Sequence, residues 1–178
     1  DADGHIDQSA LDRELLRYSD RSLKIGAFSA ASNVTGIVSD TTGITRLLHH
    51  HGALAFWDFA AAGPYVDIKM QPDSDPQSAK DAVFLSPHKF IGGPGTPGVL
   101  VVRRDLLTNR VPDVVGGGTV TYVNADDHQY VEDPVRREEA GTPAIVEAIR
   151  AGLVMQLKPA VGVETSRAHE DDQLQRAL

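Results

Sequence analysis

Short runs of apolar residues alternate along the chain with segments in which apolar residues recur every three or four positions. The first pattern is typical of buried strands, and the second of helices that bury one face. Four runs predict strands, at residues 23–29, 53–57, 81–85 and 99–102. Helical spacing predicts one helix within residues 1–20 and another from Asp40 to His51. This alternation of strands and helices indicates an α/β fold.

Capping signals mark the ends of these two helices. We expect the first helix to begin near Ser9. Asp40 or Thr41 can cap the second helix, because their side-chain oxygens accept hydrogen bonds from the free N–H groups of the first turn. Gly52 is suited to end that helix. Both helices are therefore expected to be short and bounded by polar residues.

The carboxyl-terminal half is predicted to be more polar. Residues 126–134 are acidic and indicate a mobile loop over the site, and Arg137 is expected to form an ion pair with Glu139. Thr142 can cap a third helix, and residues 163–178 indicate a charged amphipathic helix. The inner stripe expected for the third helix consists of Ile145, Ile149, Leu153 and Leu157.

Composition narrows the classes of protein that fit. The chain has 178 residues, 41% of them hydrophobic, which is enough for one domain with a real core. A net charge of -8 argues against nucleic acid or an anionic membrane as the main partner. The absence of cysteine from the sequence rules out disulfides and thiolate metal sites within it. With no transmembrane or signal pattern, we expect a cytoplasmic protein.

The stretch from residue 81 to residue 103 carries the most informative chemistry. Lys89 follows a predicted strand and a proline that fixes the local backbone. A partly desolvated lysine in such a place can form a Schiff base with an aldehyde, although a solvated surface cation is the alternative. Asp58 ends the preceding strand. Because ligands gather at the carboxyl ends of parallel strands, we expect Asp58 and Lys89 to converge there, with the carboxylate able to pair with a protonated ring nitrogen.

Two glycine-rich segments and a histidine triplet give weaker signals. The loop Gly92–Gly98 lacks the patterns typical of nucleotide sites, so we interpret it as a tight connection that lets strand 99–102 run antiparallel. A nucleotide site there is the alternative. The segment Gly116–Thr119 can present backbone N–H groups to an anion, or can simply be a flexible turn. Consecutive helical residues at 49–51 point about 100° apart, so no metal site is predicted there.

Five motifs follow one another between residues 26 and 157. They are Ser32-Asn33-Val34-Thr35-Gly36, His51-Gly52-Ala53 with Asp58-Phe59-Ala60-Ala61, Ser86-Pro87-His88-Lys89, Gly116-Gly117-Gly118-Thr119 and Glu139-Ala140-Gly141-Thr142-Pro143. Their order and spacing resemble those of class V pyridoxal-phosphate enzymes, the group of cysteine desulfurases, selenocysteine lyases and aminotransferases. The resemblance implies a three-layer α/β/α fold with a mostly parallel sheet, the large domain of a fold type I transferase.

The resemblance also implies roles for single residues. Lys89 would hold pyridoxal 5'-phosphate as an internal aldimine and then move protons at the α carbon of an amino-acid substrate. Asp58 would pair with the ring nitrogen, and Asn33 would bond the phenolic oxygen or the substrate carboxylate. The other cofactor-binding residues that it implies are Ala60, Ser86, His88, Gly118 and Thr119.

Some of these contacts imply a second subunit. In enzymes that this chain resembles, the segment containing Gly118 and Thr119 reaches across a two-fold interface to the neighbour's phosphate, which implies a homodimer. Within one subunit, Ser86 would reach the phosphate, and His88 would contact the phosphate or the ring. The cofactor site is thus expected to need two copies of the chain.

The resemblance leaves the reaction open. It implies that residues 1–178 are part of the large domain, and that an amino-terminal segment and a small carboxyl-terminal domain lie outside this chain. The latter usually supplies the substrate-binding arginine and, in desulfurases, the reactive cysteine. Ala61 stands where many desulfurases have a glutamine. Transamination and carbon–sulfur cleavage therefore both remain, beside two other readings: an inactive scaffold fragment, or a nucleotide-binding domain that uses the Gly92–Gly98 loop.

Overall fold

The computed structural model describes residues 1–177, and Leu178, the last residue of the predicted terminal helix, lies outside the described residues. The helices are α1 (Gln8–Arg17), α2 (Thr41–His50), α3 (Pro134–Glu138), α4 (Ile145–Val161) and α5 (Val163–Ala177). The strands are β1 (Ile25–Ser29), β2 (Leu54–Asp58), β3 (Ala82–Leu85), β4 (Val99–Val102), β5 (Val120–Val123) and β6 (His128–Tyr130). Short 3-10 helices are η1 (Pro76–Ser78), η2 (Pro87–Lys89) and η3 (Arg104–Leu106).

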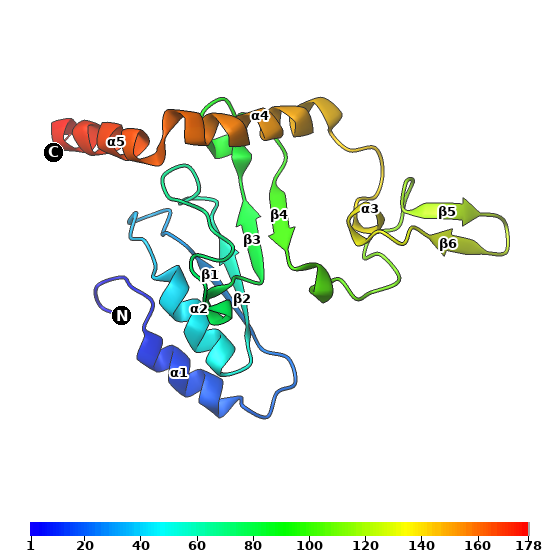
Figure 1. Cartoon of the computed structure of the whole chain (residues 1–178), viewed down its shortest axis with the longest axis horizontal. Helices are drawn as coiled ribbons and strands as arrows, with labels where there is room; N and C mark the ends of the chain where they lie inside the picture. The colour runs from blue at the N-terminus through cyan, green and yellow to red at the C-terminus, as the bar shows by residue number, and fades with distance from the viewer. Residues whose placement is uncertain (178) are drawn as a thin grey trace.

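Four strands form the central sheet in the order β1-β2-β3-β4 (Figure 1). The first three strands are parallel, and β4 pairs antiparallel with β3. This arrangement confirms the mostly parallel α/β fold and the antiparallel direction predicted for residues 99–102. The register pairs Ser29 with Asp58 and Asp58 with Phe84. The carboxyl ends of β1, β2 and β3 therefore share one edge of the sheet.

The core lies between the sheet and α2. Side chains alternate along a strand, so Ala55 and Trp57 of β2 both point toward this helix. Trp57 is fully buried, and its Nε1 donates a hydrogen bond to Thr45 Oγ1 at 2.9 Å. A side chain at position 26 would meet Leu48 at 2.5 Å, so this position of β1 needs glycine for α2 to approach the sheet. The predicted Asp40 cap of α2 is confirmed.

The opposite face of the sheet is more open. Ile25, Phe84 and Leu100 point to this side, and their exposed fractions are 48%, 41% and 53%. Helix α4 instead lies near Val83, Leu85 and Val101 on the face that also carries α2. The packed helices of residues 1–177 therefore lie on one face of the sheet. Within these residues, no second layer of helices covers the other face, although the resemblance implies one.

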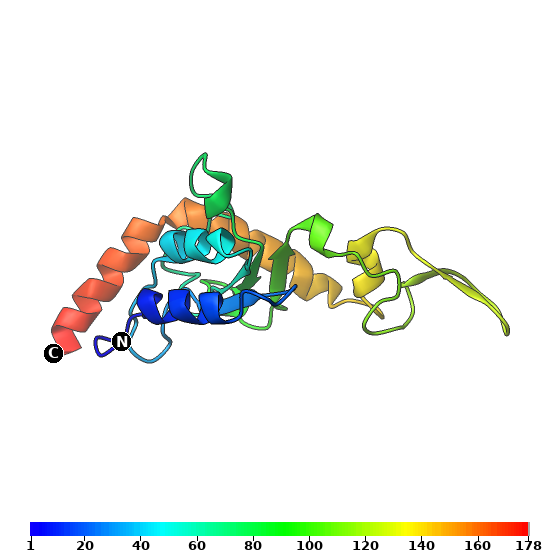
Figure 2. The same ribbon diagram turned by 90° about the horizontal axis from the view of Figure 1, so that it is seen from below.

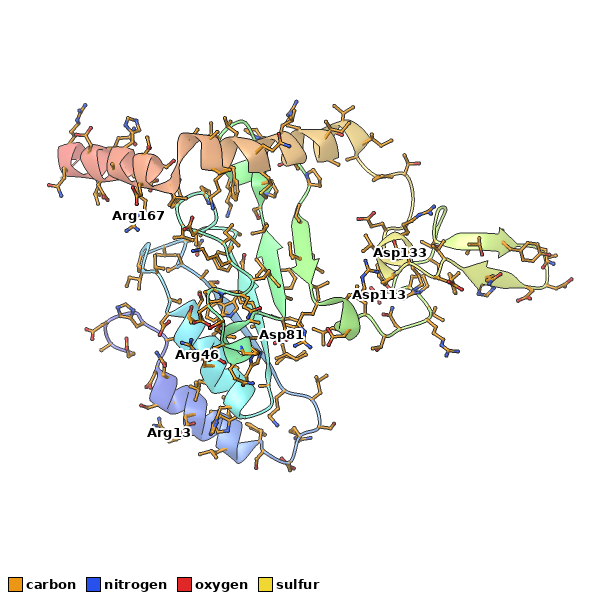
Figure 3. All side chains as sticks on the ribbon, viewed as in Figure 1. Arg13, Arg46, Asp81, Asp113, Asp133 and Arg167 are labelled. Atoms are coloured by element: carbon orange, nitrogen blue, oxygen red, sulfur yellow. The ribbon has the colours of Figure 1, made fainter. Side chains whose placement is uncertain are left out.

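A buried carboxylate ties α2 to the sheet. Asp81 has no exposed surface, and its side chain accepts hydrogen bonds from the backbone N–H of Ala55, from Arg103 and from His49 at 2.7–2.8 Å. Figure 3 shows Asp81 inside the body of the molecule. The other nitrogen of the His49 ring contacts the carbonyl of Gln77 at 2.9 Å. This carboxylate therefore joins α2, β2, β3 and the end of β4.

Residues 116–138 form a lobe that projects from the sheet (Figures 1 and 2). Strands β5 and β6 pair as an antiparallel hairpin, with α3 at its base. The loop predicted at residues 126–134 is wrong for residues 128–130, which pair with β5 in a strand that lies away from the subunit's own sheet edge. The predicted Arg137–Glu139 ion pair is also wrong, because Arg137 is buried and donates to the carbonyls of Val131 and Glu132.

The start predicted for the first helix near Ser9 is confirmed, since α1 begins at Gln8 and the Asp7 carboxylate caps it by accepting from the N–H of Ala10 at 2.9 Å. The predicted cap and the predicted inner face of the third helix differ from the structure. Ala144 occupies the cap position of α4, and Thr142 is exposed. The side chains that α4 buries are Ala151 and Val154. The stripe predicted to face inward is exposed to 57%, 62%, 60% and 39% at Ile145, Ile149, Leu153 and Leu157.

Within residues 1–177, no helix is both long and apolar enough to cross a membrane.

The histidine triplet at the end of α2 has its own local partners. His49 binds Asp81, and His51 binds Asp12 at 2.7 Å. These two rings thus face different carboxylates on different elements.

Candidate active site

The candidate site is the sheet edge at which β1, β2 and β3 end. Two backbone hydrogen bonds continue the pairing just beyond the strands, from the N–H of Ala30 to the carbonyl of Asp58 at 2.8 Å and from the N–H of Phe59 to that of Phe84 at 2.9 Å. They hold the loops at residues 31–38, 59–66 and 86–91 side by side. In open α/β sheets this is where ligands bind.

Asp58 is the last residue of β2 and is exposed. By alternation it points to the same side of the sheet as Phe56, away from the core that Trp57 enters. Its Oδ1 accepts a hydrogen bond from the backbone N–H of Ala60 at 2.7 Å. This bond within the turn sets the direction of the carboxylate at the edge of the sheet.

Lys89 ends η2, just beyond β3. Pro87 is buried, and a side chain at position 93 would lie 1.8 Å from its carbonyl oxygen, so the glycine loop packs directly against this turn. The N–H of Lys89 donates to the carbonyl of Ser86 at 3.0 Å. The lysine side chain itself is exposed, so residues 1–177 do not provide the desolvation expected for it. The turn fixes its backbone while leaving its amine accessible.

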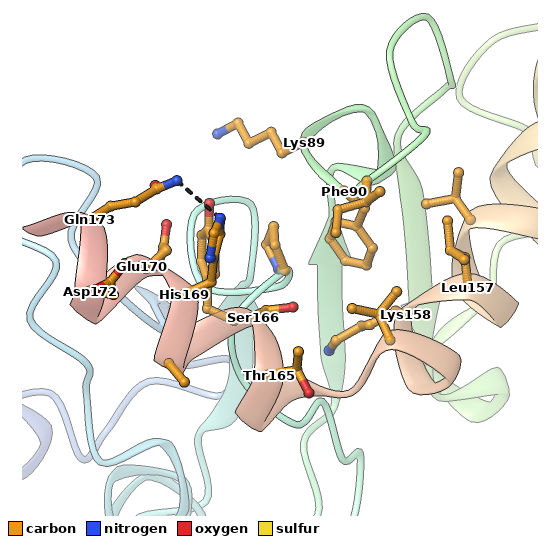
Figure 4. Close-up of a pocket in the computed structure, with 16 residues that line it drawn as sticks. Lys89, Phe90, Leu157, Lys158, Thr165, Ser166, His169, Glu170, Asp172 and Gln173 are labelled. Atoms are coloured by element: carbon orange, nitrogen blue, oxygen red, sulfur yellow. Dashed lines mark hydrogen bonds between the residues drawn. The ribbon is translucent and has the colours of Figure 1, made fainter.

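Lys89 lines a cavity of about 680 Å³ between η2 and the helices α4 and α5 (Figure 4). Phe90, Leu157 and Lys158 form one side of it, and His169 of α5 lies on the other. A volume of a few hundred Å³ is typical of sites for small ligands. The amine thus stands beside a space that a ring-sized molecule can enter.

Asn33 lines a second cavity, of about 360 Å³, together with Ala61 and Arg167. The two cavities share two wall residues, Tyr65 and Glu170. Burial raises the pKa of the Tyr65 hydroxyl, and the nearby Glu170 carboxylate raises it further. Tyr65 and Glu170 therefore line both the space beside Lys89 and the space beside Asn33.

The structure brings some predicted site residues together and separates others. Asp58 and Ala60 are bonded to each other, and Ser86 and His88 flank the same sheet edge, with His88 exposed. Ser86 precedes η2 without capping it through its side chain. Asp58 is not among the residues that line either cavity. The walls include Tyr65, Arg167 and Glu170, which the sequence did not indicate, because only the fold brings α5 over these loops.

Gly118 and Thr119 lie in the projecting lobe, apart from this edge (Figure 1). Thr119 is fully buried, and its hydroxyl donates to the carbonyl of Gly116 at 2.6 Å. The N–H of Gly141 donates to the carbonyl of Gly117 at 2.8 Å. The glycine motif and the Glu139–Pro143 motif are thus neighbours, a pairing that their sequence positions did not reveal. The predicted phosphate contact of this segment stays a prediction.

The glycines of the 92–98 loop serve packing. Besides the tight contact at Gly93, a side chain at position 92 would touch Leu157 and Val154 of α4 at 3.8–3.9 Å. Turn hydrogen bonds link Gly93 to the carbonyl of Phe90 and Thr96 to that of Gly93. Gly93 is thus required by close approach to η2, whereas Gly92 and Gly95 adopt positive φ angles of 79° and 83° that favour glycine, and the loop gives no support to the nucleotide-site alternative.

Comparison with known proteins gives a consistent result. A sequence model of the family "Aminotransferase class-V" matches residues 1–178. "Probable cysteine desulfurase" of Aeropyrum pernix is 34% identical over 149 residues, which are 82% of this chain and 35% of that protein. "Probable cysteine desulfurase 2" of Mycobacterium leprae is 30% identical over 175 residues, 98% of this chain and 40% of that protein.

Solved structures show the same relationship. The apo structure of a cysteine desulfurase from Thermococcus onnurineus superposes with a TM-score of 0.75 and 26% identity, over 92% of this chain and 38% of that one. A NifS-like protein from Rickettsia africae shares the fold, with a TM-score of 0.70 at 18% identity, over 97% of this chain and 43% of that one. The chain thus spans about two fifths or less of the length of the Aeropyrum pernix and Mycobacterium leprae proteins and of the Thermococcus onnurineus cysteine desulfurase. By its matched length, its motif order and its fold, it belongs to the class V aminotransferase family.

Proposed function

We propose that this chain forms the cofactor-binding part of a pyridoxal-phosphate enzyme that acts on an amino acid. One observation carries the proposal: an amine and a carboxylate follow neighbouring parallel strands at the same sheet edge, Lys89 after β3 and Asp58 at the end of β2. They stand within the ordered motifs of a family whose named relatives include cysteine desulfurases. The rest of the enzyme would complete the site.

The side chains at this edge suit pyridoxal phosphate. Lys89 offers an accessible amine for the aldehyde, and the Asp58 carboxylate, already oriented by Ala60, would keep a proton on the ring nitrogen. Ser86 and His88 would hold the phosphate, and Asn33 the phenolic oxygen. When bound, the cofactor supplies an electron sink for the α carbon of an amino acid. Lys89 would then carry the proton to and from that carbon.

The projecting lobe supports a homodimer. Built side chains at Gly117 and Gly118 would meet nothing within 4 Å, so the backbone there is open on the surface. The Thr119 hydroxyl is directed into its own turn, which leaves the backbone N–H groups as the groups best placed to meet an anion. Because the lobe extends away from its own sheet edge, we propose that it meets the phosphate held by the other subunit.

Two reactions fit this chain. The relatives named above are cysteine desulfurases, which favours a carbon–sulfur lyase. Ala61, which lines the cavity beside Asn33, stands in place of the glutamine of many desulfurases and leaves transamination as the alternative. Both reactions need the same proton carrier and the same ring-nitrogen partner, so the assignment of Lys89 and Asp58 is independent of this choice.

Titration of the chain with one equivalent of pyridoxal phosphate tests the proposal. We expect an absorption band at roughly 410–430 nm from the lysine-bound cofactor, and borohydride should fix the pyridoxyl group on the peptide that contains Lys89. Lys89→Ala should abolish the band. Asp58→Asn should weaken binding several-fold while the reduced adduct stays on Lys89. Lys69→Ala, which removes an exposed lysine elsewhere, is the matched control.

The mapped position of the adduct decides the outcome. A band of full strength in Lys89→Ala, or a fixed pyridoxyl group on another peptide at one equivalent, would refute the role of Lys89. Equal binding by wild type and Asp58→Asn would refute the role of the carboxylate. Circular dichroism of each variant shows whether a lost signal reflects chemistry or unfolding.

A further inference from the structure

Lys158 of α4 is a second amine in the cavity that Lys89 lines. Its side chain is half-buried, its Nζ donates a hydrogen bond to the carbonyl of Val66, and it lies 5.7 Å from the centre of the Phe90 ring. Figure 4 shows the side chain passing beside Phe90 at the floor of the cavity. The amine is therefore held by one carbonyl and one ring, without a carboxylate in hydrogen-bond contact among the described residues.

The cavity gives this amine access to small molecules. This open cavity of about 680 Å³ is lined near Lys158 by apolar and aromatic side chains, among them Tyr65, Phe90 and Leu157. Pockets of this size hold ligands larger than a single aromatic ring. An aromatic aldehyde can thus lie against Phe90 or Tyr65 with its carbonyl carbon near Nζ.

Burial raises the neutral, nucleophilic fraction of the amine, whereas the Phe90 ring and the Val66 carbonyl favour its charged form. Burial lowers the pKa of Lys158, and the charge of Asp67 opposes this only in part. The hydrogen bond to Val66 needs one N–H, which the neutral amine retains, so its lone pair stays free. The other ionisable side chains around this cavity are Tyr65, Lys89, His169, Glu170 and Asp172.

We propose that Lys158 is a modification site for small aromatic aldehydes without a phosphate group, separate from the cofactor lysine, whose own ligand would be held at the sheet edge by its phosphate. The Nζ lone pair attacks the carbonyl carbon and forms a C–N bond. The carbonyl oxygen takes up two protons, both supplied by the amine nitrogen by way of solvent, and leaves as water, which gives a neutral imine without any change of oxidation state. The inference does not depend on the proposed function, since it needs neither Asp58 nor a bound cofactor.

Two other lysines serve as references for the reactivity of Lys158, one buried and one accessible. Lys80 is also buried, at 3% exposed, and its pKa is also lowered, but it lines none of the cavities described above. Lys69 is accessible, with 60% of its side chain exposed, but it is not buried. Lys158 combines burial with access. It should therefore react faster than either.

Reductive labelling tests this directly. The whole chain is treated at neutral pH with limiting benzaldehyde and cyanoborohydride, and benzylated lysines are quantified by peptide mass spectrometry. We expect Lys158 to be labelled several-fold faster than Lys69, and Lys80 to remain unlabelled. Thr165→Trp, which fills the same cavity from α5, should slow labelling of Lys158 several-fold and leave that of Lys69 unchanged.

Labelling of Lys158 no faster than that of Lys69 would overturn the proposal. Equal labelling of Lys158 in wild type and Thr165→Trp would overturn the role of the cavity. Labelling of Lys80 at the same rate as Lys158 would show that reaction follows unfolding, and would also overturn it. Since pyridoxyl mapping at Lys89 and benzyl mapping at Lys158 give separate peptides, failure of one assignment is distinguishable from failure of the other.

Discussion

Replacing Asp81 by alanine should destabilise the chain more than any single surface change. The carboxylate has no exposed surface and accepts from three donors. In Asp81→Ala the N–H of Ala55, at the centre of the sheet, loses its side-chain acceptor. His49, with 13% of its side chain exposed, loses its carboxylate partner. Arg103 is 47% exposed, so water can solvate its freed donor.

The size of the loss follows from these three environments. An unsatisfied buried N–H contributes about 1–3 kcal/mol. Losing the hydrogen-bond partner of the largely buried His49 ring costs about 1–3 kcal/mol more. Because Arg103 is hydrated and its share is small, we expect a total of about 2–6 kcal/mol, a large part of the roughly 5–15 kcal/mol that stabilises a typical domain.

Urea unfolding followed by circular dichroism measures this loss. With a slope of about 2 kcal/mol per M, the urea midpoint should fall by about 2 M. Asp105→Ala is the matched control, because Asp105 binds the same Arg103 but is 63% exposed, and its loss should move the midpoint far less. Equal midpoints for the two variants would refute the reasoning that burial makes Asp81 the stronger partner.

Two further predictions follow from packing and from charge. Gly93→Ala should lower the free energy of unfolding in urea by about 1–3 kcal/mol, because its Cβ would clash with the Pro87 carbonyl. Gly117→Ala, with open space around it, should change this free energy little. Similar losses of stability in the two variants would contradict the prediction. Burial lowers the pKa of Lys80 in the folded chain below its ordinary value of 10.5. Between these two pKa values the unfolded chain binds more protons than the folded chain, so the free energy of unfolding should rise with pH in that window. Lys80→Met should reduce this rise, and an unchanged slope of stability against pH would contradict the assignment.

Local patterns were enough to predict the elements of the sheet. Apolar runs located β1 to β4, the Gly/Pro loop indicated that β4 reverses direction, and Asp40 marked the start of α2. These features depend on residues within a few positions of one another, so the sequence alone contains their physical cause. The motif order also placed Lys89 and Asp58 after neighbouring strands, although their role with a cofactor is a proposal.

Contacts between distant segments decided the rest. The hairpin in place of a loop at residues 126–134, the exposed stripe of α4 and the carbonyl partners of Arg137 follow from which segments pack together. Sequence spacing gives the period of a helix but not which of its faces finds a partner. The two cavities that meet at Tyr65 and Glu170 likewise exist only because α5 folds back over loops about a hundred residues earlier in the chain.

The sequence by itself thus determined the class of the fold and the order of its reactive groups, since strand alternation and helix caps are short-range effects. The tertiary structure alone decided the surroundings of each group: an exposed Lys89, a half-buried Lys158 that lines the same cavity and a Thr119 closed into its own turn. Burial and hydrogen bonding set the reactivity of an amine or a hydroxyl, and both depend on which distant residues come to lie around it.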